Sequence, residues 1–527
     1  MDMKALRQKI LDLAIRGKLV PQDPDDEPAY VLLERIRQQK QQMVKEGKLK
    51  PKDIKNDSVI FVGEDNLHYE KFADGSVKCI EDEIPFDLPE GWEWERLSNL
   101  ASFSGGKTPS TSRSEYWDGD ILWVTSKDMK SKYITSSQLR LSALGAEQMQ
   151  MYQPDTLLLV TRSGILRHTL PVAILKECAT INQDLKAIIL YMPQLAEYIY
   201  VCLKGMETQL LLKYTKSGTT VENVNFDEFQ KVLLPIPPIQ QIDRIMSSTG
   251  SAESVVSTIE DNKAALADYV VKAKSKILDL AIRGQLVPQD PNDEPASVLL
   301  ERIRAEKEEL IKQGKIKRDK KESFIFRGED NSYYEKMGAE VRCIDSELPF
   351  DLPDSWTFAR LKHISEIVGG GTPKTNIAEY WDGNIPWLTP ADFSGYEKMY
   401  ISAGARTITE LGLKSSSAQM LPKNSVLYSS RAPIGYIAIA ATPVATNQGF
   451  KSVVPYDLAM SPYLFYCLKA ITDDIIQRAT GTTFKEISGS EMAETIIPLP
   501  PIHEQQRIFK KATRLFEVIT TIEKSLS

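Results

Sequence analysis

The middle of the chain carries the pattern of one long amphipathic helix. Pro237–Pro238 and Gly284 flank the segment 239–283, as expected for the start and the end of a helix. Apolar residues recur there every seven positions in two sets, the second interrupted by Lys263: Ala252, Ile259, Leu266, Ala273, Leu280, and Val256, Val270, Ile277. This spacing is typical of a coiled-coil seam. It predicts a helix roughly 65 Å long that packs against another helix.

The same seam continues, divided between the two ends of the chain. Apolar residues at the two ends of the chain occupy the same heptad positions as the seam of the central segment. They are Leu515, Ile519, Ile522 and Leu526 near the C-terminus, and Met3, Leu6, Ile10 and Leu13 near the N-terminus. We therefore expect helices over 501–526 and 3–15 that stack end to end and pack antiparallel against the central helix. The alternative is that each terminal helix packs only on its own domain.

The rest of the chain alternates between turn-rich breakers, charged helices and short apolar runs. Breakers rich in Pro and Asp at 21–28 and 288–295 precede helical patterns at 29–46 and 296–313. Short apolar runs bounded by Gly, Pro, Ser and Asp predict strands at 121–125, 156–161, 185–190, 426–429 and 436–441, with helices near 195–203 and 462–471. These patterns predict two mixed α/β domains of about 140 residues each.

The chain is an internal repeat. The segment Lys9–Arg37 recurs at Lys276–Arg304 with 26 of 29 positions identical, and 105–129 recurs at 369–393 with 14 of 25 identical. Little aligns between about 130–180 and 394–444. Two halves of about 264 residues thus share one frame around divergent middles, which predicts one scaffold that presents two different surfaces.

This organisation predicts a mixed α/β (α+β) fold with a pseudo-twofold repeat, in which two long antiparallel coiled-coil helices separate two similar domains. The expected segments are an N-terminal helix (1–20), a helical and acidic connector (21–83), a first variable domain (84–237), the central helix (238–284), a second connector (285–347), a second variable domain (348–500) and a C-terminal helix (501–527).

Charge is distributed unevenly along the chain, whose net charge is −7. Residues 59–95 carry eleven acidic and two basic side chains, whereas 96–216 carry fourteen basic and ten acidic, and 360–486 twelve basic and ten acidic. A DNA-binding face need only be locally basic, so the overall negative charge does not exclude one. Ordinary solvated surfaces are the alternative explanation of these counts.

Several function classes lack their sequence signals. Five scattered cysteines and four histidines, none at metal-ligand spacing, indicate a reducing cytoplasm and no metal site. The sequence contains no stretch of 18 or more apolar residues, so no membrane span is expected. The chain has no GxGxxG after a strand, no GxxxxGK[ST], and no Asp/Asn-Pro-Pro-aromatic loop of an adenine methyltransferase. We therefore expect no catalytic residues.

Three repeated motifs can be compared with known families: LDLAIRG[KQ]LVPQ, LP[IL]PPI-x-[EQ]-Q at the start of the predicted helices, and GGxTPxT…EYWDG…W in the variable domains. With these motifs the chain resembles the specificity subunits of type I restriction-modification systems. The resemblance covers essentially the whole chain. The connectors at about 38–83 and 305–347 depart from it, because many family members are shorter there.

The resemblance implies a non-catalytic, cytoplasmic subunit of a bacterium or archaeon. Its expected partners are double-stranded DNA, two modification (methyltransferase) subunits and, through the complex, restriction (motor-nuclease) subunits, with no membrane. No cofactor is expected on this chain, since S-adenosylmethionine, ATP and Mg²⁺ belong to the partners. Two alternatives stay open: a solitary scaffold that binds methyltransferase subunits without reading DNA, and a fused restriction-methylation polypeptide.

We expect positions shared by both halves to contact the DNA backbone and unshared positions to read bases. The candidate shared contacts are Thr108, Arg162, Asn182, Gln183, Thr219 and Thr220, matched by Thr372, Arg431, Asn447, Gln448, Thr482 and Thr483, with Lys107, Lys374 and Lys485 beside them. The candidate base readers are Ser126, Lys127, Arg167, Asp392 and Tyr436. Alternatively, the Asn-Gln pairs and Gly-Thr-Thr turns cap local backbone. The aromatic pairs Tyr116–Trp117 and Tyr380–Trp381 are expected in the core rather than as stacking platforms for bases.

Overall fold

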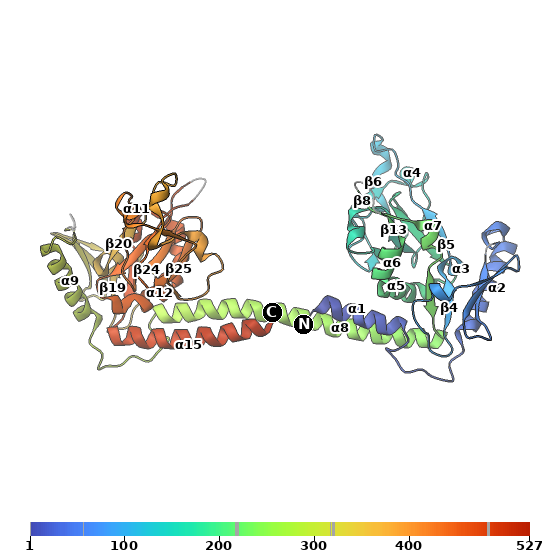
Figure 1. Ribbon diagram of the computed structural model, residues 1–527, viewed down its shortest axis with the longest axis horizontal. Helices are drawn as coiled ribbons and strands as arrows, with labels where there is room; N and C mark the ends of the chain where they lie inside the picture. Colours follow the sequence, from blue (N-terminus) through green and yellow to red (C-terminus); the bar gives the residue numbers. More distant parts are fainter. Residues whose placement is uncertain are drawn as a thin grey trace. The chain divides into compact units, whose positions relative to one another are not determined.

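The protein forms two compact units, Met1–Asn262 and Lys263–Ser527, each containing one copy of the repeat. This is a computed structural model (Figure 1), which describes residues 2–55, 57–216, 221–316, 318, 322–481 and 485–526. The boundary between the units falls within the long helix α8, Ile239–Ile282. The central helix predicted at 239–283 is thus confirmed to within one residue.

In each unit a terminal helix lies antiparallel to one part of α8 (Figure 1). In the first, Arg7 of α1 (Met3–Ile15) pairs with Glu253 and Glu260 of α8, at 2.8 Å each. In the second, Glu523 of α15 (Ile502–Leu526) pairs with Lys274 of α8 at 2.6 Å. The expected antiparallel packing is confirmed within each unit. The end-to-end stacking of α1 and α15 stays a prediction.

The predicted seam is buried along only part of its length. Val256, Val270 and Ile277 are all less than 10% exposed, as the heptad pattern requires. Leu266, however, is 45% exposed, which the pattern did not predict. In the second unit Val270 is buried in the cluster that contains Ile519 of α15, and Leu266 lies about one turn beyond Val270 on α8. The heptad pattern gives the phase of the seam but not the point at which its partner ends.

Terminal helix α1 also packs on its own domain. Gln8 Nε2 donates to the carbonyl oxygen of Gly205, at the end of α5 (Ala196–Gly205), over 2.8 Å. An added Cβ at Gly205 would lie 3.0 Å from the Ile15 side chain, so the two helices are in close contact. Both arrangements considered for this helix are therefore present together.

The two variable domains have the same sheet topology. In the first, a five-stranded sheet has the order β5-β12-β9-β10-β7 and a three-stranded sheet the order β11-β6-β8, while β15 pairs with β4. In the second, the corresponding orders are β20-β27-β24-β25-β22, β23-β21-β26 and β19-β28. The predicted mixed α/β class is confirmed.

The strands of the first variable domain are β4 (Glu93–Arg96), β5 (Ala101–Gly105), β6 (Trp117–Val124), β7 (Tyr133–Ile134), β8 (Leu139–Leu141), β9 (Leu157–Val160), β10 (Val172–Leu175), β11 (Ala179–Ile181), β12 (Leu185–Leu190), β13 (Thr215–Lys216), β14 (Asn223–Val224) and β15 (Leu233–Ile236). Its helices are α3 (Leu97–Leu100), α4 (Ala143–Ala146), α5, α6 (Glu207–Tyr214) and α7 (Phe226–Phe229).

The strands of the second variable domain are β19 (Thr357–Arg360), β20 (Ser365–Gly369), β21 (Trp381–Leu388), β22 (Tyr400–Ile401), β23 (Arg406–Ile408), β24 (Val426–Ser430), β25 (Ile434–Ala440), β26 (Ala445–Thr446), β27 (Lys451–Pro455) and β28 (Ile496–Leu499). Its helices are α10 (Leu361–Ile364), α11 (Glu410–Lys414), α12 (Ser461–Ala470), α13 (Thr472–Arg478) and α14 (Gly489–Ala493).

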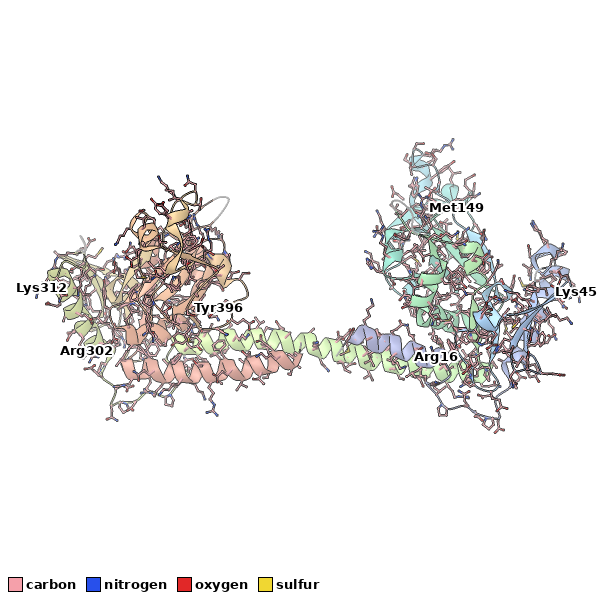
Figure 2. All side chains as sticks on the ribbon, viewed as in Figure 1. Arg16, Lys45, Met149, Arg302, Lys312 and Tyr396 are labelled. Atoms are coloured by element: carbon pink, nitrogen blue, oxygen red, sulfur yellow. The ribbon has the colours of Figure 1, made fainter. Side chains whose placement is uncertain are left out.

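The connectors contain more structure than expected. Each begins with the predicted charged helix, α2 (Ala29–Lys45) or α9 (Ala296–Lys312); Figure 2 labels their last residues. Each then forms a three-stranded antiparallel sheet, which the sequence analysis did not predict. We call residues 57–83 and 322–347 the first and second sheet modules. Their strands are β1 (Ser58–Val62), β2 (His68–Phe72) and β3 (Val77–Cys79), and β16 (Ser323–Arg327), β17 (Tyr333–Met337) and β18 (Glu340–Cys343).

A joint in each unit connects the helices to the variable domain. Gly17 follows α1 with φ 63°, and an added Cβ would lie 2.6 Å from Pro89 Cγ and 3.0 Å from the Trp92 ring. The buried Trp92 donates its indole N–H to Gln241 Oε1, near the start of α8, over 2.9 Å. Only glycine combines this left-handed backbone with so close an approach.

The second unit repeats the joint. Gly284 has φ 69°, and an added Cβ would lie 2.6 Å from Pro353. Trp356 donates to Glu504 of α15 over 3.0 Å. The repeated LAIRG and FDLP sequences therefore have a structural cause, since they form the same joint twice.

Replacing Gly17 by Ala should lower the free energy of unfolding by about 2–4 kcal/mol, because the methyl group meets Pro89 and Trp92 on a left-handed backbone. Gly47 is the matched control: its φ is 72°, but an added Cβ would meet nothing within 4 Å. Gly47→Ala should cost only about 1 kcal/mol. Urea unfolding followed by tryptophan fluorescence measures both, and equal losses would show that the joint is not tightly packed.

Candidate nucleic-acid interface

The loop that follows the first strand of each five-stranded sheet is pressed against the domain. An added Cβ at Gly106 would lie 2.1 Å from the Ile181 carbonyl oxygen, and one at Gly370 would lie 1.9 Å from that of Asn447. Glycine is required at both positions because no side chain fits between the two backbones. The GG pair of the repeat thereby brings the loops 105–111 and 369–375 onto the ends of β11 and β26.

Two tryptophans hold each of these loops from within the domain. In the first domain, Trp123 Nε1 and Trp117 Nε1 donate to the carbonyl oxygens of Lys107 and Ser110, each over 3.2 Å. The two rings meet edge to face, with centroids 5.0 Å apart. Trp381 and Trp387 repeat this pair at 5.0 Å in the second domain. Trp381 is only 6% exposed, so the expectation that this aromatic belongs to the core is confirmed.

The loops bring together residues that lie far apart in sequence. The Thr108 hydroxyl donates to Gln183 Oε1, and the Thr372 hydroxyl donates to Gln448 Oε1 in the same way. All four side chains are exposed. Because the threonine holds the amide oxygen, the amide N–H groups of each glutamine remain as donors. Paired neutral donors of this kind suit a phosphate oxygen.

The neighbouring asparagines bond backbone within their own turns. Asn182 Oδ1 accepts from the backbone N–H of Asp184 over 3.2 Å, and Asn447 Oδ1 accepts from that of Gly449 over 2.9 Å. These bonds cap the turns that present Gln183 and Gln448. The caps fit the alternative in which the asparagines bond local backbone, and DNA contacts by Asn182 and Asn447 stay a prediction.

The shared arginines follow equivalent strands but differ in their partners. Arg162 is exposed, and among the described residues no carboxylate pairs with it. Its backbone forms a bridge with Asn223. Arg431 forms the equivalent bridge with Glu486, and its guanidinium lies 3.6 Å from that carboxylate. The guanidinium of Arg162 is therefore the more available of the two for an external anion.

The remaining shared candidates divide into two groups. Lys107, Lys374 and Lys485 have exposed side chains. The predicted contacts of Thr219, Thr220, Thr482 and Thr483 lie outside the described residues.

Two of the predicted base readers are engaged within their own domain. Asp392 accepts from the backbone N–H of Thr389 at 2.7 Å through one oxygen and from that of Ala405 at 2.7 Å through the other. Asp128 makes the same two contacts, to Thr125 and Gln138, at 2.8 Å each. The position is therefore shared by both halves and makes local structural contacts, while base reading by Asp392 stays a prediction.

Arg167 is the second engaged candidate. It donates to Glu222, which is buried, and this hydrogen bond lowers the pKa of the Glu222 carboxyl. Ser126 is half-buried and Lys127 is exposed, both in the turn after β6, so they remain candidates. Tyr436 is half-buried against the core cluster that contains Phe393.

The segments after the shared arginines differ in structure. Residues 161–171 connect β9 to β10 and include a short 3₁₀ helix, Gly164–Arg167, with Ile165 47% exposed. Only residues 431–433 connect β24 to β25 in the second domain. Two domains of one topology thus present unlike surfaces beside equivalent arginines.

Arg406 is a residue that the sequence analysis missed. Its guanidinium lies 3.6 Å from the centre of the Trp381 ring, beside the loop 369–375. The register of β8 on β6 places Leu139 at the matching position of the first domain. The two domains therefore carry Arg and Leu at equivalent positions of their sheets. Arg406 lies in the part of the repeat that does not align, where no pattern marked it.

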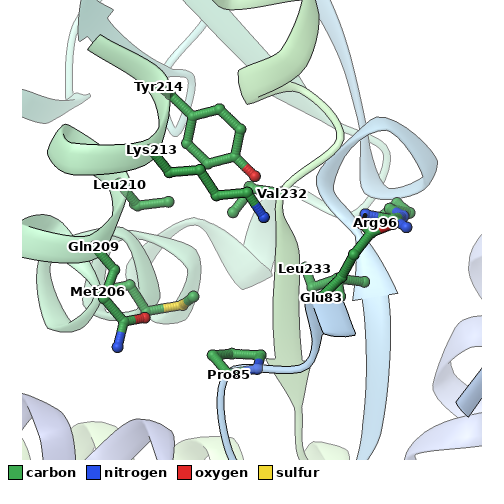
Figure 3. A pocket seen from close by; sticks show the side chains of 10 residues that line it. All are labelled: Glu83, Pro85, Arg96, Met206, Gln209, Leu210, Lys213, Tyr214, Val232 and Leu233. Atoms are coloured by element: carbon green, nitrogen blue, oxygen red, sulfur yellow. Dashed lines mark hydrogen bonds and ion pairs between the residues drawn. The ribbon is translucent and has the colours of Figure 1, made fainter. Parts of the chain in front are cut away.

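The described residues contain no group of His, Cys, Asp and Glu that could hold a metal ion, and no described helix is long and apolar enough to cross a membrane. Figure 3 shows a pocket where the first sheet module meets α6 and β15. Its wall includes the Glu83–Arg96 ion pair, at 2.8 Å. None of the candidate DNA contacts lines this pocket.

Comparison with known proteins matches two parts of the chain to one family. Residues 89–252 and 353–527 match the model of the type I restriction modification DNA specificity domain. The specificity subunit of the type I restriction enzyme EcoAI from Escherichia coli is 26% identical over 99% of this chain and 90% of its own length. That of MjaIX from Methanocaldococcus jannaschii is 46% identical over 30% of this chain and 37% of its own length.

A solved structure of a type I restriction-modification system contains a chain of similar fold. It is 17% identical, with a TM-score of 0.52 over 84% of this chain and 94% of that one. The family model alone covers more than half of the sequence, in the two regions that the repeat makes equivalent. The chain therefore belongs to the specificity subunits of type I restriction-modification systems, the non-catalytic component of type I restriction enzymes.

Proposed function

We propose that the chain binds double-stranded DNA at a bipartite, asymmetric sequence, each variable domain reading one half-site. The observation that carries this proposal is the Thr–Gln pair, which recurs as Thr108–Gln183 and Thr372–Gln448 beside connections of different structure. Shared exposed donors fit the constant phosphate backbone, and unlike neighbouring surfaces fit two different base sequences. The half-site centres lie about one duplex turn apart, ~34–36 Å.

The proposal includes two modification subunits, one beside each half-site, and restriction subunits recruited through the complex. It is supported by the repeat, which gives each half the same frame, including the near-identical segments 11–22 and 278–289. In this account S-adenosylmethionine, ATP and Mg²⁺ bind to the partners and not to this chain. The complex works in the cytoplasm, where its DNA lies; the five described cysteines are all free thiols, as suits that compartment.

Replacing Arg162 by Ala should weaken binding of the assembled complex to every duplex by about 3- to 10-fold, and reduce the salt slope by about one, because a phosphate contact carries no sequence information. Fluorescence anisotropy with a cognate and a scrambled duplex measures this. Lys510→Ala, at an exposed lysine of α15, is the control and should change neither affinity. If Arg162→Ala changed only which sequence is bound, shared positions would not be backbone contacts.

Inserting seven residues into α8 beside Lys263 should keep the seam in phase and lengthen the recognised gap by about three base pairs, because seven helical residues rise about 10 Å. An insertion of two residues should break the seam and prevent assembly. Sequencing of the methylated sites measures the gap. An active complex with the seven-residue insertion and an unchanged gap would assign the spacing to the partners rather than to the helix.

A further inference from the structure

The two sheet modules have an unusual distribution of polar and apolar side chains. Neighbours along a strand point to opposite faces, so Ser58, Ile60 and Glu70 share the inner face, which packs on the variable domain. Val59 and Phe61 point outward and are 41% and 39% exposed. An antiparallel sheet on a solvated surface normally shows the reverse, with charges outside and apolar groups inside.

Buried ion pairs hold the inner faces in place. Arg96 of β4 donates to both oxygens of Glu70, at 3.2 and 2.7 Å, and to Glu83 at 2.8 Å. Arg360 of β19 bonds both oxygens of Glu335 at 2.7 Å. These hydrogen bonds lower the pKa of Glu335 to about 2, so it is ionised throughout the neutral range. Each module is thereby fixed on its variable domain through charge, with its apolar face turned outward.

The outer faces match at five of six positions, Val59 and Phe324 being the exception. Strand register places Val59, Phe61, Tyr69, Lys71, Val77 and Cys79 on the first, and Phe324, Phe326, Tyr334, Lys336, Val341 and Cys343 on the second. The Phe61 and Tyr69 rings stack with centroids 5.8 Å apart, and Phe326 and Tyr334 do the same at 5.8 Å. Aspartates hold both tyrosine hydroxyls, Asp65 at 2.7 Å and Asp330 at 2.8 Å.

This match restricts what can cover the faces. The same surface occurs in both halves although the DNA-reading segments differ, so its occupant is one protein bound twice rather than two base sequences. The first module carries eight acidic and two basic side chains and the second seven and three, which repels phosphate. The same charge disfavours a second copy of this chain, because two acidic rims would meet.

We propose that the outer faces of the two sheet modules are docking surfaces for the two modification subunits, one on each face. The partner surface that fits is apolar and bordered by lysine or arginine. This inference rests on the proposed function, which supplies a partner present in two copies. The modules lie outside the two regions that match the family model, so the contact adds to whatever the shared domains provide.

The test uses the full chain assembled with its modification subunit and weighed by native mass spectrometry. Phe61→Glu and Phe326→Glu each place a carboxylate in an apolar contact and should weaken binding at that face about 100-fold. When both proteins are at nanomolar concentration, each single variant should retain one modification subunit and the double variant none. Phe61→Leu, which keeps the face apolar, should retain two.

Leu212→Glu is the matched control, because Leu212 on α6 is 81% exposed and has no place on either face. It should bind two subunits, and the melting temperatures of all variants should match that of the unaltered chain. Two subunits retained by the double variant would overturn the inference, as would dimers of the chain alone that Phe61→Glu abolishes. An unaltered chain that bound no modification subunit would contradict the proposed function, and this inference with it.

Discussion

The packing of one tryptophan against one glycine in each half fixes the relation between helix and variable domain on which the remaining geometry depends. Trp92 bonds Gln241 of α8 and, together with Pro89, leaves no room for a side chain at Gly17. Trp356 bonds Glu504 of α15 and, together with Pro353, does the same at Gly284. A loosened joint would leave the variable domain free to turn on its helix. The proposed function needs each surface at a fixed angle and distance, and this joint is the constraint that the sequence repeats most faithfully.

Within each variable domain, shared residues also fix the position of the loops. The Trp117–Trp123 and Trp381–Trp387 pairs hold the loops, the glycines bring them onto β11 and β26, and the asparagines turn the glutamines outward. These shared parts form one platform. Beside it, the differing elements are the connections after Arg162 and Arg431 and the exchange of Leu139 for Arg406. The shared positions and the differing positions are thus separated in space as they are in sequence.

The sequence predicted the long helix, the repeat and several strands closely, because a heptad pattern over 252–280 and a comparison of halves need no tertiary information. It missed the sheet modules because β2 carries Glu70 at mid-strand, where an apolar residue is expected, and Arg96 lies 26 residues away. The local backbone contacts of Asp392 and Asn182 were also not predicted. A carboxylate or an amide suits a base and a turn equally well, and only the fold shows which neighbour is within reach.

The central claim is that the frame is interchangeable and the variable domains alone choose the sequence. Arg96 of β4 pairs with Leu233 of β15, and Arg360 of β19 pairs with Ile496 of β28 in the same way. These pairs give matched junctions for a chimaera in which a second copy of residues 361–495 replaces residues 97–232. The most direct measurement is the sequence methylated by a complex containing this chain. The account predicts a site with two copies of the half-site read by the second domain, separated by the original gap. The account would be contradicted if the chimaera directed methylation to the original asymmetric sequence, or to sites that contain only one copy of the second domain's half-site.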